Sequence, residues 1–259
     1  MLAHIDGDFL RYASSGSPGV ERRYYTVQGL KDEFRYKKDA VLYCKEHDIP
    51  VENIEARQEV IDESLMYTLI DQMMDRIMHD TGATEYLLYI EGEGNYRKDI
   101  WPAYKSSRKK YLTPMLKHTA EDYLIDVYGA IPVEDIETDD EVAISYNEYG
   151  GVLCSNDKDL RQVPGVIYNP DTRSTEIIKE HEAVRILYEQ ILCGDSVDDI
   201  PGAPKIGKKR AQQHLAGCDT AKEMWDVCLE LYDDDDFANL NAQLVYILRS
   251  ENDKWKPPA

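Results

Sequence analysis

Three short apolar runs along the chain predict buried parallel strands, at residues 2–5, 86–90 and 152–154. Each run is followed by acidic residues. A helical pattern lies between the first two runs, over residues 59–79, where apolar side chains recur every four positions at Ile61, Leu65, Leu69, Met73 and Ile77. This alternation predicts an α/β fold with a central, mostly parallel sheet and helices on both faces.

Two stretches stand outside this alternation. Residues 14–58 hold turn signals (SSGSPG, HDIP) and a lysine-rich helix candidate over 31–47, which we interpret as an insertion that forms a surface subdomain. After residue 180 the pattern is helical to the end of the chain. We therefore predict an α/β domain over residues 1–190 and a helical region over residues 191–259.

The composition changes this picture only in part. The formal net charge of −20 over 259 residues favours a soluble protein that nucleic acid and anionic membranes repel. The five cysteines show no C-x-x-C spacing, so neither a disulfide framework nor a zinc site is predicted, and a reducing cytoplasm fits them. No apolar run approaches the roughly 18 residues of a membrane span, and no signal peptide is expected.

The net charge hides a segregation of basic residues. Residues 96–117 hold seven positive side chains against one acid, and residues 201–214 hold four against none. Aromatic residues are interleaved with the first segment, at Tyr96, Trp101, Tyr104 and Tyr111. Rings that stack on bases, beside cations that take phosphates, favour binding of nucleic acid over a merely solvated basic helix.

Acidic residues gather after the predicted strands, and parallel strands bring their carboxyl ends to one edge of a sheet. The acids that follow strands are Asp6, Asp8, Glu91, Glu93, Asp157 and Asp159. Further acids stand in IETDDEVA, at Glu137, Asp139 and Asp140, and in CGDSVDD, at Asp195 and Asp198.

Any one of these acids is more typical of a helix cap or a solvated charge. If they converge, each like-charged pair about 4 Å apart costs roughly 4 kcal/mol at an effective dielectric constant near 20, so several pairs require cations. Oxygen ligands suit Mg²⁺ or Mn²⁺, and two such ions form the usual clamp for in-line attack on a phosphodiester.

A haloacid-dehalogenase-like phosphatase is the alternative interpretation of the first aspartates. That scheme uses D-x-D after the first strand, then Ser or Thr, Lys and a late acidic motif, for which Asp6 and Asp8, Ser155, Lys179 and GDSVDD are available. It leaves IETDD and the spacing of Asp157 and Asp159 unexplained.

The second basic segment has the composition of a phosphate-binding hairpin. In IPGAPKIGKKRAQQHL, Gly202 and Gly207 permit tight turns, and the helix that follows offers backbone N–H groups to a phosphate. Lys205, Lys208 and Lys209 would strengthen that contact.

Taken in order, these motifs resemble a bacteriophage 5′→3′ exonuclease of the flap-endonuclease (5′-nuclease) superfamily, which has a PIN/5′-nuclease-like fold. GDSVDDIPGAPKIGKKRAQQHL (194–215) is similar to its helix–three-turn–helix element, IETDDEVA to its E-x-D-D helix start and NDKDL to its D-x-D. Arg97 and YKSSR (104–108), within 96–117, resemble its helical arch or clamp segment.

The resemblance implies roles for individual residues. The implied metal ligands are Asp6, Glu137, Asp139, Asp140, Asp157, Asp159, Asp195 and Asp198, with Glu91 as a ninth and Glu93 as its rival. Arg97 and Lys105 match residues that bring the scissile phosphate to the metals, and Arg108 matches an arch contact. The implied DNA contacts are Tyr104, Gly202, Lys205, Gly207, Lys208 and Lys209. Asp8 matches no ligand position and is expected to be a turn residue.

The resemblance also implies the activity. It indicates a monomeric hydrolase with two Mg²⁺ (or Mn²⁺) ions and a K⁺ ion at the helix–three-turn–helix, which cuts DNA near 5′ ends, flaps or nicks during phage replication or recombination. The preference between exonuclease and flap cutting, the use of RNA–DNA hybrids and the roles of residues 14–58 and of the last 45 residues stay open. A branched-DNA binding protein with an inactive site is a second alternative.

Overall fold

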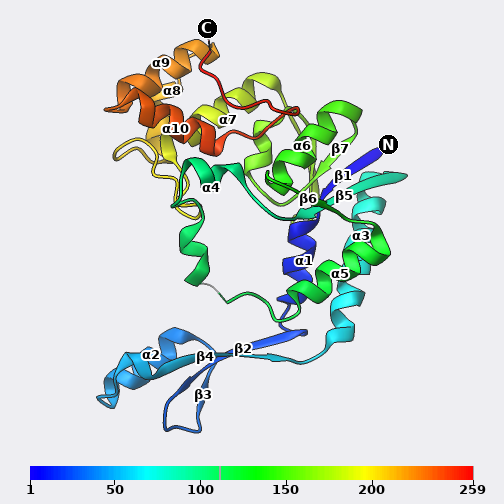
Figure 1. Ribbon diagram of the computed structural model, residues 1–259, viewed down its shortest axis with the longest axis vertical. Helices are drawn as coiled ribbons and strands as arrows, with labels where there is room; N and C mark the ends of the chain where they lie inside the picture. The colour runs from blue at the N-terminus through cyan, green and yellow to red at the C-terminus, as the bar shows by residue number, and fades with distance from the viewer. Residues whose placement is uncertain (111, 259) are drawn as a thin grey trace. The chain divides into compact units, whose positions relative to one another are not determined.

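A six-stranded sheet with the order β6-β5-β1-β7-β8-β9 forms the centre of the fold in the computed structural model, which describes residues 1–110 and 112–258 (Figure 1). The strands are β1 (Leu2–Asp6), β5 (Glu85–Glu91), β6 (Ile131–Val133), β7 (Val152–Cys154), β8 (Gly165–Asn169) and β9 (Ser174–Ile178). All neighbours run parallel except β8 and β9. The predicted mostly parallel sheet is confirmed.

The three strands expected from apolar runs lie side by side at its centre. Ile5 on β1 pairs with Leu88 on β5 and with Cys154 on β7. These side chains are buried because the strands are covered on both faces, which explains why they read as continuous apolar runs. The acids that follow β1 and β7 therefore emerge at the same edge of the sheet.

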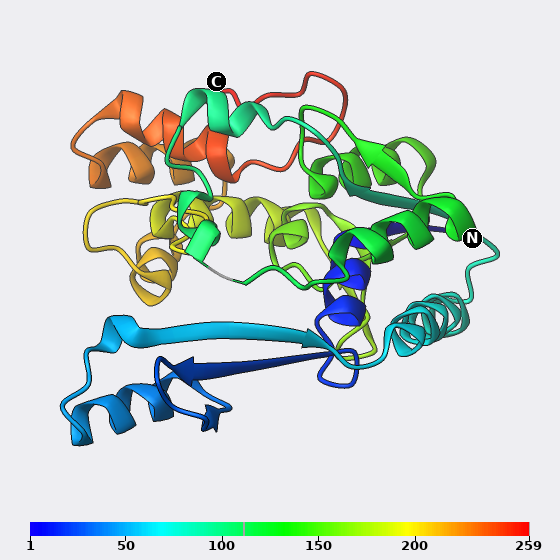
Figure 2. The ribbon, with the colours of Figure 1, turned by 60° about the horizontal axis from the view of Figure 1, so that its bottom comes forward.

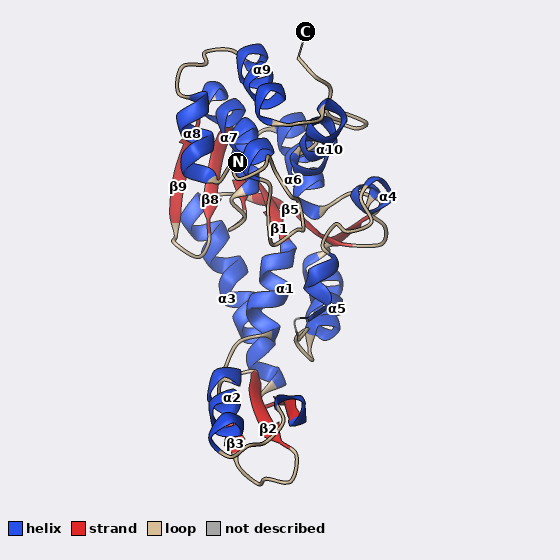
Figure 3. Ribbon diagram, turned by 90° about the vertical axis from the view of Figure 1, so that its left-hand side faces the viewer, coloured by secondary structure: helices blue, strands red, loops and turns tan. Residues whose placement is uncertain are grey.

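Helices cover both faces of this sheet. Helix α6 (Thr138–Tyr149) packs on one face, where Val142 meets Leu153 and Ile167 (Figure 3). Successive strand residues point to opposite faces, so Tyr168 on β8 points to the other one. There its hydroxyl donates to Asp80, near the end of α3 (Glu63–Thr81), at 2.8 Å.

The chain is helical after residue 180, as predicted, but the last helix ends at Val245 and residues 246–258 form no helix, so the helical pattern does not reach the end of the chain. The helices of this region are α7 (Glu180–Cys193), α8 (Lys208–Leu215), α9 (Ala221–Leu231) and α10 (Asp235–Val245). Leu192, Trp225 and Ala242 share one apolar cluster, while Ala183 on α7 packs in the cluster on the sheet face. By compactness the chain divides into unit 1 (Met1–Phe9, Met74–Leu112 and residues from 128 onward) and unit 2 (Leu10–Met73 and Thr113–Val127). The predicted boundary at 190/191 stays a prediction.

Unit 2 contains the predicted insertion, which has a small sheet of its own. Strands β2 (Glu21–Val27), β3 (Glu33–Phe34) and β4 (Ile54–Val60) are antiparallel, and the register runs from Glu21↔Val60 to Val27↔Ile54 (Figure 2). Helix α2 (Lys37–Glu46) packs on it through Ala40 and Cys44. The helices predicted over 31–47 and 59–79 therefore begin later than expected, because residues near their predicted starts belong to β3 and β4.

The segment over 96–117 contains short helical turns. They are α4 (Tyr96–Ile100) and a 3-10 turn (Ser106–Lys110), and α5 (Lys117–Tyr128) follows. Tyr111, one of the interleaved aromatic residues, lies outside the described residues. The arch stays a prediction. Helix α1 (Gly7–Ser15) and a 3-10 turn at Val51–Asn53 and another at Asp159–Gln162 complete the elements.

All five cysteines are free thiols. None of the helices in the described part of the chain combines the length and the apolar character that crossing a membrane needs.

Candidate active site

Asp6 ends the central strand β1 and lies buried at the carboxyl edge of the sheet. Its Oδ1 accepts the backbone N–H of Asp8 at 2.9 Å, and its Oδ2 accepts the Ser155 hydroxyl at 2.8 Å. Ser155 Oγ in turn accepts the N–H of Asp157 at 3.0 Å. Ser155 therefore ties the first aspartate to the loop after β7, a role that the sequence did not predict.

Asp139 stands in the first turn of α6 and brings a further carboxylate to the same place. Its Oδ1 is buried and has no hydrogen-bond partner among the described residues. Burial, with the negative charges of Asp157 and Asp6, raises the pKa of Asp139 well above its usual value. Burial and the charge of Asp8 likewise raise the pKa of Asp6 to about 7. Asp6, Asp139 and Asp157 thus lie close enough for their charges to interact.

Asp159 completes this group, which we call the aspartate cluster (Asp6, Asp139, Asp157 and Asp159). Its backbone N–H donates to Asp157 Oδ1 at 2.8 Å, and the Gln190 amide donates to its side chain. Burial and the charge of Asp157 raise the pKa of Asp159 to about 7. In this cluster burial and mutual repulsion thus outweigh the nearby positive charges of Lys105 and Lys158.

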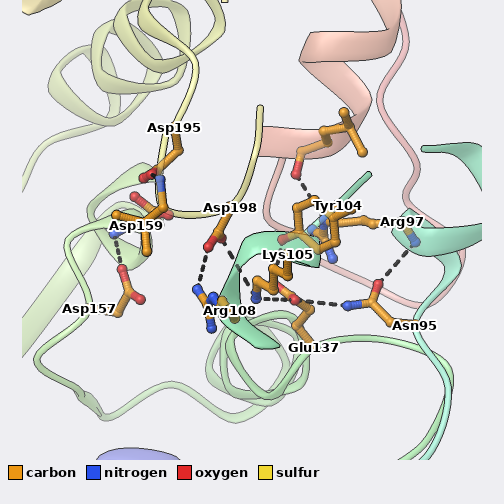
Figure 4. Close-up of polar contacts among 12 residues, drawn as sticks. Asn95, Arg97, Tyr104, Lys105, Arg108, Glu137, Asp157, Asp159, Asp195 and Asp198 are labelled. Carbon is orange, nitrogen blue, oxygen red and sulfur yellow. Dashed lines mark hydrogen bonds and ion pairs between the residues drawn. The ribbon is translucent and has the colours of Figure 1, made fainter. Parts of the chain in front are cut away.

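Asp195 lies beside Asp159 but has its own cation (Figure 4). Lys158 Nζ approaches Asp195 Oδ2 to 2.7 Å. Burial raises the pKa of Asp195, but the hydrogen bond from Lys158, together with those from the backbone N–H groups of Val197 and Asp198, outweighs that effect, so the pKa is lowered overall. Asp195 is thus close enough to complement the aspartate cluster, and Lys158 compensates its charge.

A second group, which we call the Lys105 network (Lys105, Arg108, Glu137 and Asp198), joins predicted cations to predicted metal ligands (Figure 4). Lys105 contacts Glu137 and lies 3.7 Å from Asp198 Oδ2, and Arg108 contacts Asp198. Burial raises the pKa of Glu137, but Lys105 and Arg97 outweigh it and bring the pKa to about 2. Glu137 is therefore ionised at neutral pH.

Neighbouring polar groups fix the Glu137 carboxylate in place. The Tyr104 hydroxyl donates to Oε2 at 3.1 Å, and the Asn95 amide donates to Oε1 at 2.8 Å. Tyr104 is buried, so its predicted stacking on DNA is not supported by this placement. Asn95 was not among the predicted site residues, because an asparagine that caps a short helix carries no distinctive sequence signal.

Backbone contacts hold Lys105 against the loop that carries Asp198. The N–H of Lys105 donates to the carbonyl oxygen of Asp198 at 2.9 Å, and Lys105 adopts a left-handed φ of 55°. The N–H of Ser107 donates to Asp199 Oδ2 at 2.8 Å. The basic segment and the loop after α7 are thus connected directly at the site.

Arg97 and Asp140 occupy a different place from the one predicted. The guanidinium donates to both oxygens of Asp140, at 2.5 and 2.9 Å, and both side chains are buried. Asp140 also accepts the backbone N–H groups of Glu137 and Leu248. Because these bonds occupy both groups, this placement supports neither a metal-ligand role for Asp140 nor a phosphate contact by Arg97.

Glu91 and Glu93 are both exposed after β5. The N–H of Glu91 donates to Asp8 Oδ1 at 3.1 Å, and Asp8 Oδ2 accepts the Thr138 hydroxyl at 2.7 Å. Asp8 stands in the first turn of α1 rather than in the expected turn, and it links β5 to the start of α6. The choice between Glu91 and Glu93 as a ligand stays a prediction.

The basic hairpin divides into a buried turn and an exposed helix start. Gly202 has a φ of 71°, its N–H donates to Asn241 at 2.9 Å, and a Cβ there would overlap the backbone of Cys193. Gly202 therefore has a packing role and no exposed surface for DNA. Gly207 precedes α8, and it is exposed together with Lys205, Lys208 and Lys209.

The donor set fits a divalent cation that prefers oxygen ligands. It offers several carboxylates that repel one another and the orphaned Oδ1 of Asp139. In the described part of the chain, no three His, Cys, Asp or Glu side chains already surround one point as a metal site would. Small side-chain movements would be needed to build a ligand shell.

Comparisons with known proteins agree with the fold. No family model matches the chain. A 5′-3′ exonuclease of Buchnera aphidicola subsp. Baizongia pistaciae (strain Bp) is 22% identical over 163 residues, which are 56% of this chain and 54% of that protein. The chain thus spans about half the length of this relative.

Solved structures show the same architecture. The T5 5′-exonuclease with bound zinc ions matches with a TM-score of 0.58 and 17% identity, over 69% of this chain and 80% of that one. The catalytic core of Rad2 in complex with a DNA substrate matches with a TM-score of 0.50 and 11% identity, over 98% and 78%. These similarities confirm the α/β 5′-nuclease fold.

Proposed function

We propose that this member of the 5′-nuclease superfamily is a structure-specific 5′-nuclease that hydrolyses DNA phosphodiesters near 5′ ends with the help of Mg²⁺. The observation that carries the proposal is the aspartate cluster, whose carboxylates are buried close to one another, next to the cations Lys105 and Lys158. Duplex DNA with flaps or nicks is the proposed substrate, and action on RNA–DNA hybrids, phage replication and a monomeric state remain parts of the hypothesis.

The aspartate cluster would hold the metal ions. Asp6 and Asp139 offer the most deeply placed oxygens, Asp157 and Asp159 offer oxygens on the adjoining loop, and Asp195 lies next to them (Figure 4). When bound, two divalent ions supply activation of the attacking water and stabilisation of the leaving oxygen. Manganese shares the required preference for oxygen ligands and would substitute for magnesium.

Lys105 and Arg108 would bind and orient the phosphate. In the absence of other cations they neutralise Glu137 and Asp198. Both cations lie next to carboxylates that could hold a metal ion, so beside a bound phosphate they would offset the negative charge that develops on it.

The exposed start of α8 would bind the duplex away from the cut. Gly207 leaves the first backbone N–H groups of α8 accessible, and Lys205, Lys208 and Lys209 add positive charge. These contacts are to phosphates, so they position the DNA without reading its sequence. A K⁺ ion at this hairpin remains a hypothesis from the resemblance alone.

The phosphatase alternative is disfavoured by Lys179. A phosphatase of that kind would need a lysine facing Asp6, but Lys179 is exposed at the start of α7, where its N–H donates to Glu182 at 2.9 Å. Ser155 contacts Asp6, yet it also accepts the N–H of Asp157, as a bridging residue does.

Cleavage of a 5′-labelled flap substrate tests the proposal. We expect short products with Mg²⁺, none with a chelator, and strong loss of cleavage for Asp139→Asn. Asp226→Asn is the matched control, because Asp226 is an exposed aspartate on α9 outside the cluster. Absence of cleavage with Mg²⁺ and with Mn²⁺, while the chain still binds flap DNA, would favour the inactive branched-DNA binding protein instead.

A further inference from the structure

The inserted subdomain in unit 2 exposes a basic and aromatic surface where β3 ends and α2 begins. We call it the Tyr36 patch (Arg35, Tyr36, Lys37 and Lys38). The Tyr36 side chain is 51% exposed, and its ring lies 5.4 Å from Arg35 Cζ and 5.3 Å from Lys38 Nζ. Two cations thus lie close to this half-exposed ring.

The cations of the patch differ from the arginines on the neighbouring strands. Arg22, Arg23 and Arg57 each form an ion pair with a glutamate. Arg35, Lys37 and Lys38, by contrast, form no ion pair with any residue that the structure describes. The chain carries 50 acidic residues against 30 Lys and Arg, so acids are abundant, yet this surface keeps unpaired positive charge.

Tyr36 does not contribute to the core of the subdomain. That core consists of Val27, Ala40 and Cys44, with Phe34 among the partly buried side chains packed against it. Tyr36 precedes α2 and makes no side-chain hydrogen bond as its N-cap. Packing therefore does not explain an exposed ring at this position, and the ring is available to a ligand.

We propose that the Tyr36 patch binds single-stranded nucleic acid, as a contact separate from the aspartate cluster. An exposed ring stacks on an unpaired base, while the flanking cations take the phosphates on either side. Duplex DNA presents its phosphates but hides the faces of its bases, so the ring favours a single strand. The inference rests on the proposed action on DNA, whose flaps and ends supply such strands.

Binding of a fluorescent oligothymidylate to the full chain, measured by anisotropy in a chelator to prevent cleavage, tests the proposal. We expect Tyr36→Ala to weaken binding roughly fivefold or more, and Tyr36→Phe to bind like the wild type, because stacking needs the ring alone. Replacing Arg35 and Lys38 by Gln should make the dependence of the binding constant on salt less steep. Each lost phosphate contact lowers the slope of log K against the logarithm of the salt concentration by about 0.7, so the two together lower it by about 1.4.

Arg57→Ala is the matched control, since it removes an exposed cation of the same subdomain that is already paired with Glu55. Thermal unfolding of every variant checks that the subdomain remains folded. Three results would overturn the proposal. Tyr36→Ala could leave oligothymidylate binding unchanged, or Tyr36→Phe could weaken that binding as much as Tyr36→Ala does. Sedimentation could also show that the patch variants change only the self-association of the chain.

Cleavage of the flap substrate separates this inference from the proposed function. If the wild type cleaves with Mg²⁺ but the patch variants bind oligothymidylate normally, only the inference fails. If the wild type does not cleave under any divalent cation, the proposed nuclease function fails, and the binding measurements still decide whether the Tyr36 patch holds a single strand.

Discussion

Arg97 and Asp140 form a two-point ion pair in which the guanidinium is 1% exposed and the carboxylate is not exposed at all. The remaining donors of Arg97 bond to the carbonyl oxygens of Leu244 and Tyr246, at 2.9 and 2.6 Å. The pair therefore connects the start of α6, which carries Glu137 and Asp139, to the chain segment after α10. It acts on the candidate active site by positioning α6.

We expect Asp140→Asn to destabilise the protein by about 3–5 kcal/mol, because it leaves the Arg97 charge buried without its partner. Urea unfolding followed by tryptophan fluorescence measures the change. Lys222→Ala is the control, since it breaks the exposed pair with Asp226 and should cost at most about 1 kcal/mol. Similar losses in the two variants would contradict the positioning role.

Stability without divalent cations should fall as the pH rises from about 4 to about 7. The pKa values of Asp6 and Asp159 are raised to about 7 in the folded protein, so the folded state binds more protons than the unfolded chain within this window. Mg²⁺ favours the ionised carboxylates and should offset this loss.

The gain in melting temperature on adding Mg²⁺ should therefore be larger near pH 8 than near pH 5. Differential scanning calorimetry in Mg²⁺ and in chelator gives the comparison. Asp159→Asn should reduce the gain, whereas the distant Asp226→Asn should leave it unchanged. A gain that is independent of pH would count against metal binding by these aspartates.

Lys105→Ala should lower the rate of flap cleavage roughly a hundredfold, the scale seen when one charge-stabilising donor is removed from an active site. Single-turnover kinetics with the flap substrate measure it. Lys98→Ala, at an exposed lysine on α4 of the same basic segment, should cleave almost normally. Equal rates for the two variants would remove Lys105 from the site.

Gly202→Ala should destabilise the protein by more than about 1 kcal/mol, because the new Cβ meets the Cys193 backbone and the φ of 71° disfavours alanine. Gly207→Ala is the natural comparison. Its φ is −105° and no atom lies near the added Cβ, so the cost should stay below about 1 kcal/mol. Thermal unfolding of both variants tests the distinction between the buried turn and the exposed helix start.

The sequence predicted the centre of the sheet because β1, β5 and β7 are buried on both faces and read as apolar runs. It did not predict β2 and β4, whose exposed side chains include Arg22, Arg23 and Arg57. Pairing of such strands is set by cross-strand contacts between distant residues, and a single sequence does not display them. The antiparallel hairpin β8–β9 was missed for a similar reason, since β9 is mostly exposed.

The convergence of Asp6, Asp139 and Asp157 was predictable, because parallel strands bring their carboxyl ends to one edge. The partners of each acid were not. Asp139 and Asp140 are neighbours in the chain, yet one has an orphaned oxygen and the other pairs with Arg97, since α6 turns them in different directions. The sequence spacing makes Asp139 and Asp140 equally good candidates for metal ligands, and only the packing around each side chain distinguishes them.

Arg97 donates hydrogen bonds to the carbonyl oxygens of Leu244 and Tyr246, and these bonds also set an order of events during synthesis. Until residue 246 has left the ribosome, the guanidinium lacks two of its acceptors and would be costly to bury. The start of α6, and with it Glu137 and Asp139, would then lack its final anchor. A nascent chain should therefore carry all the carboxylates of the site well before it can fold them into a working arrangement.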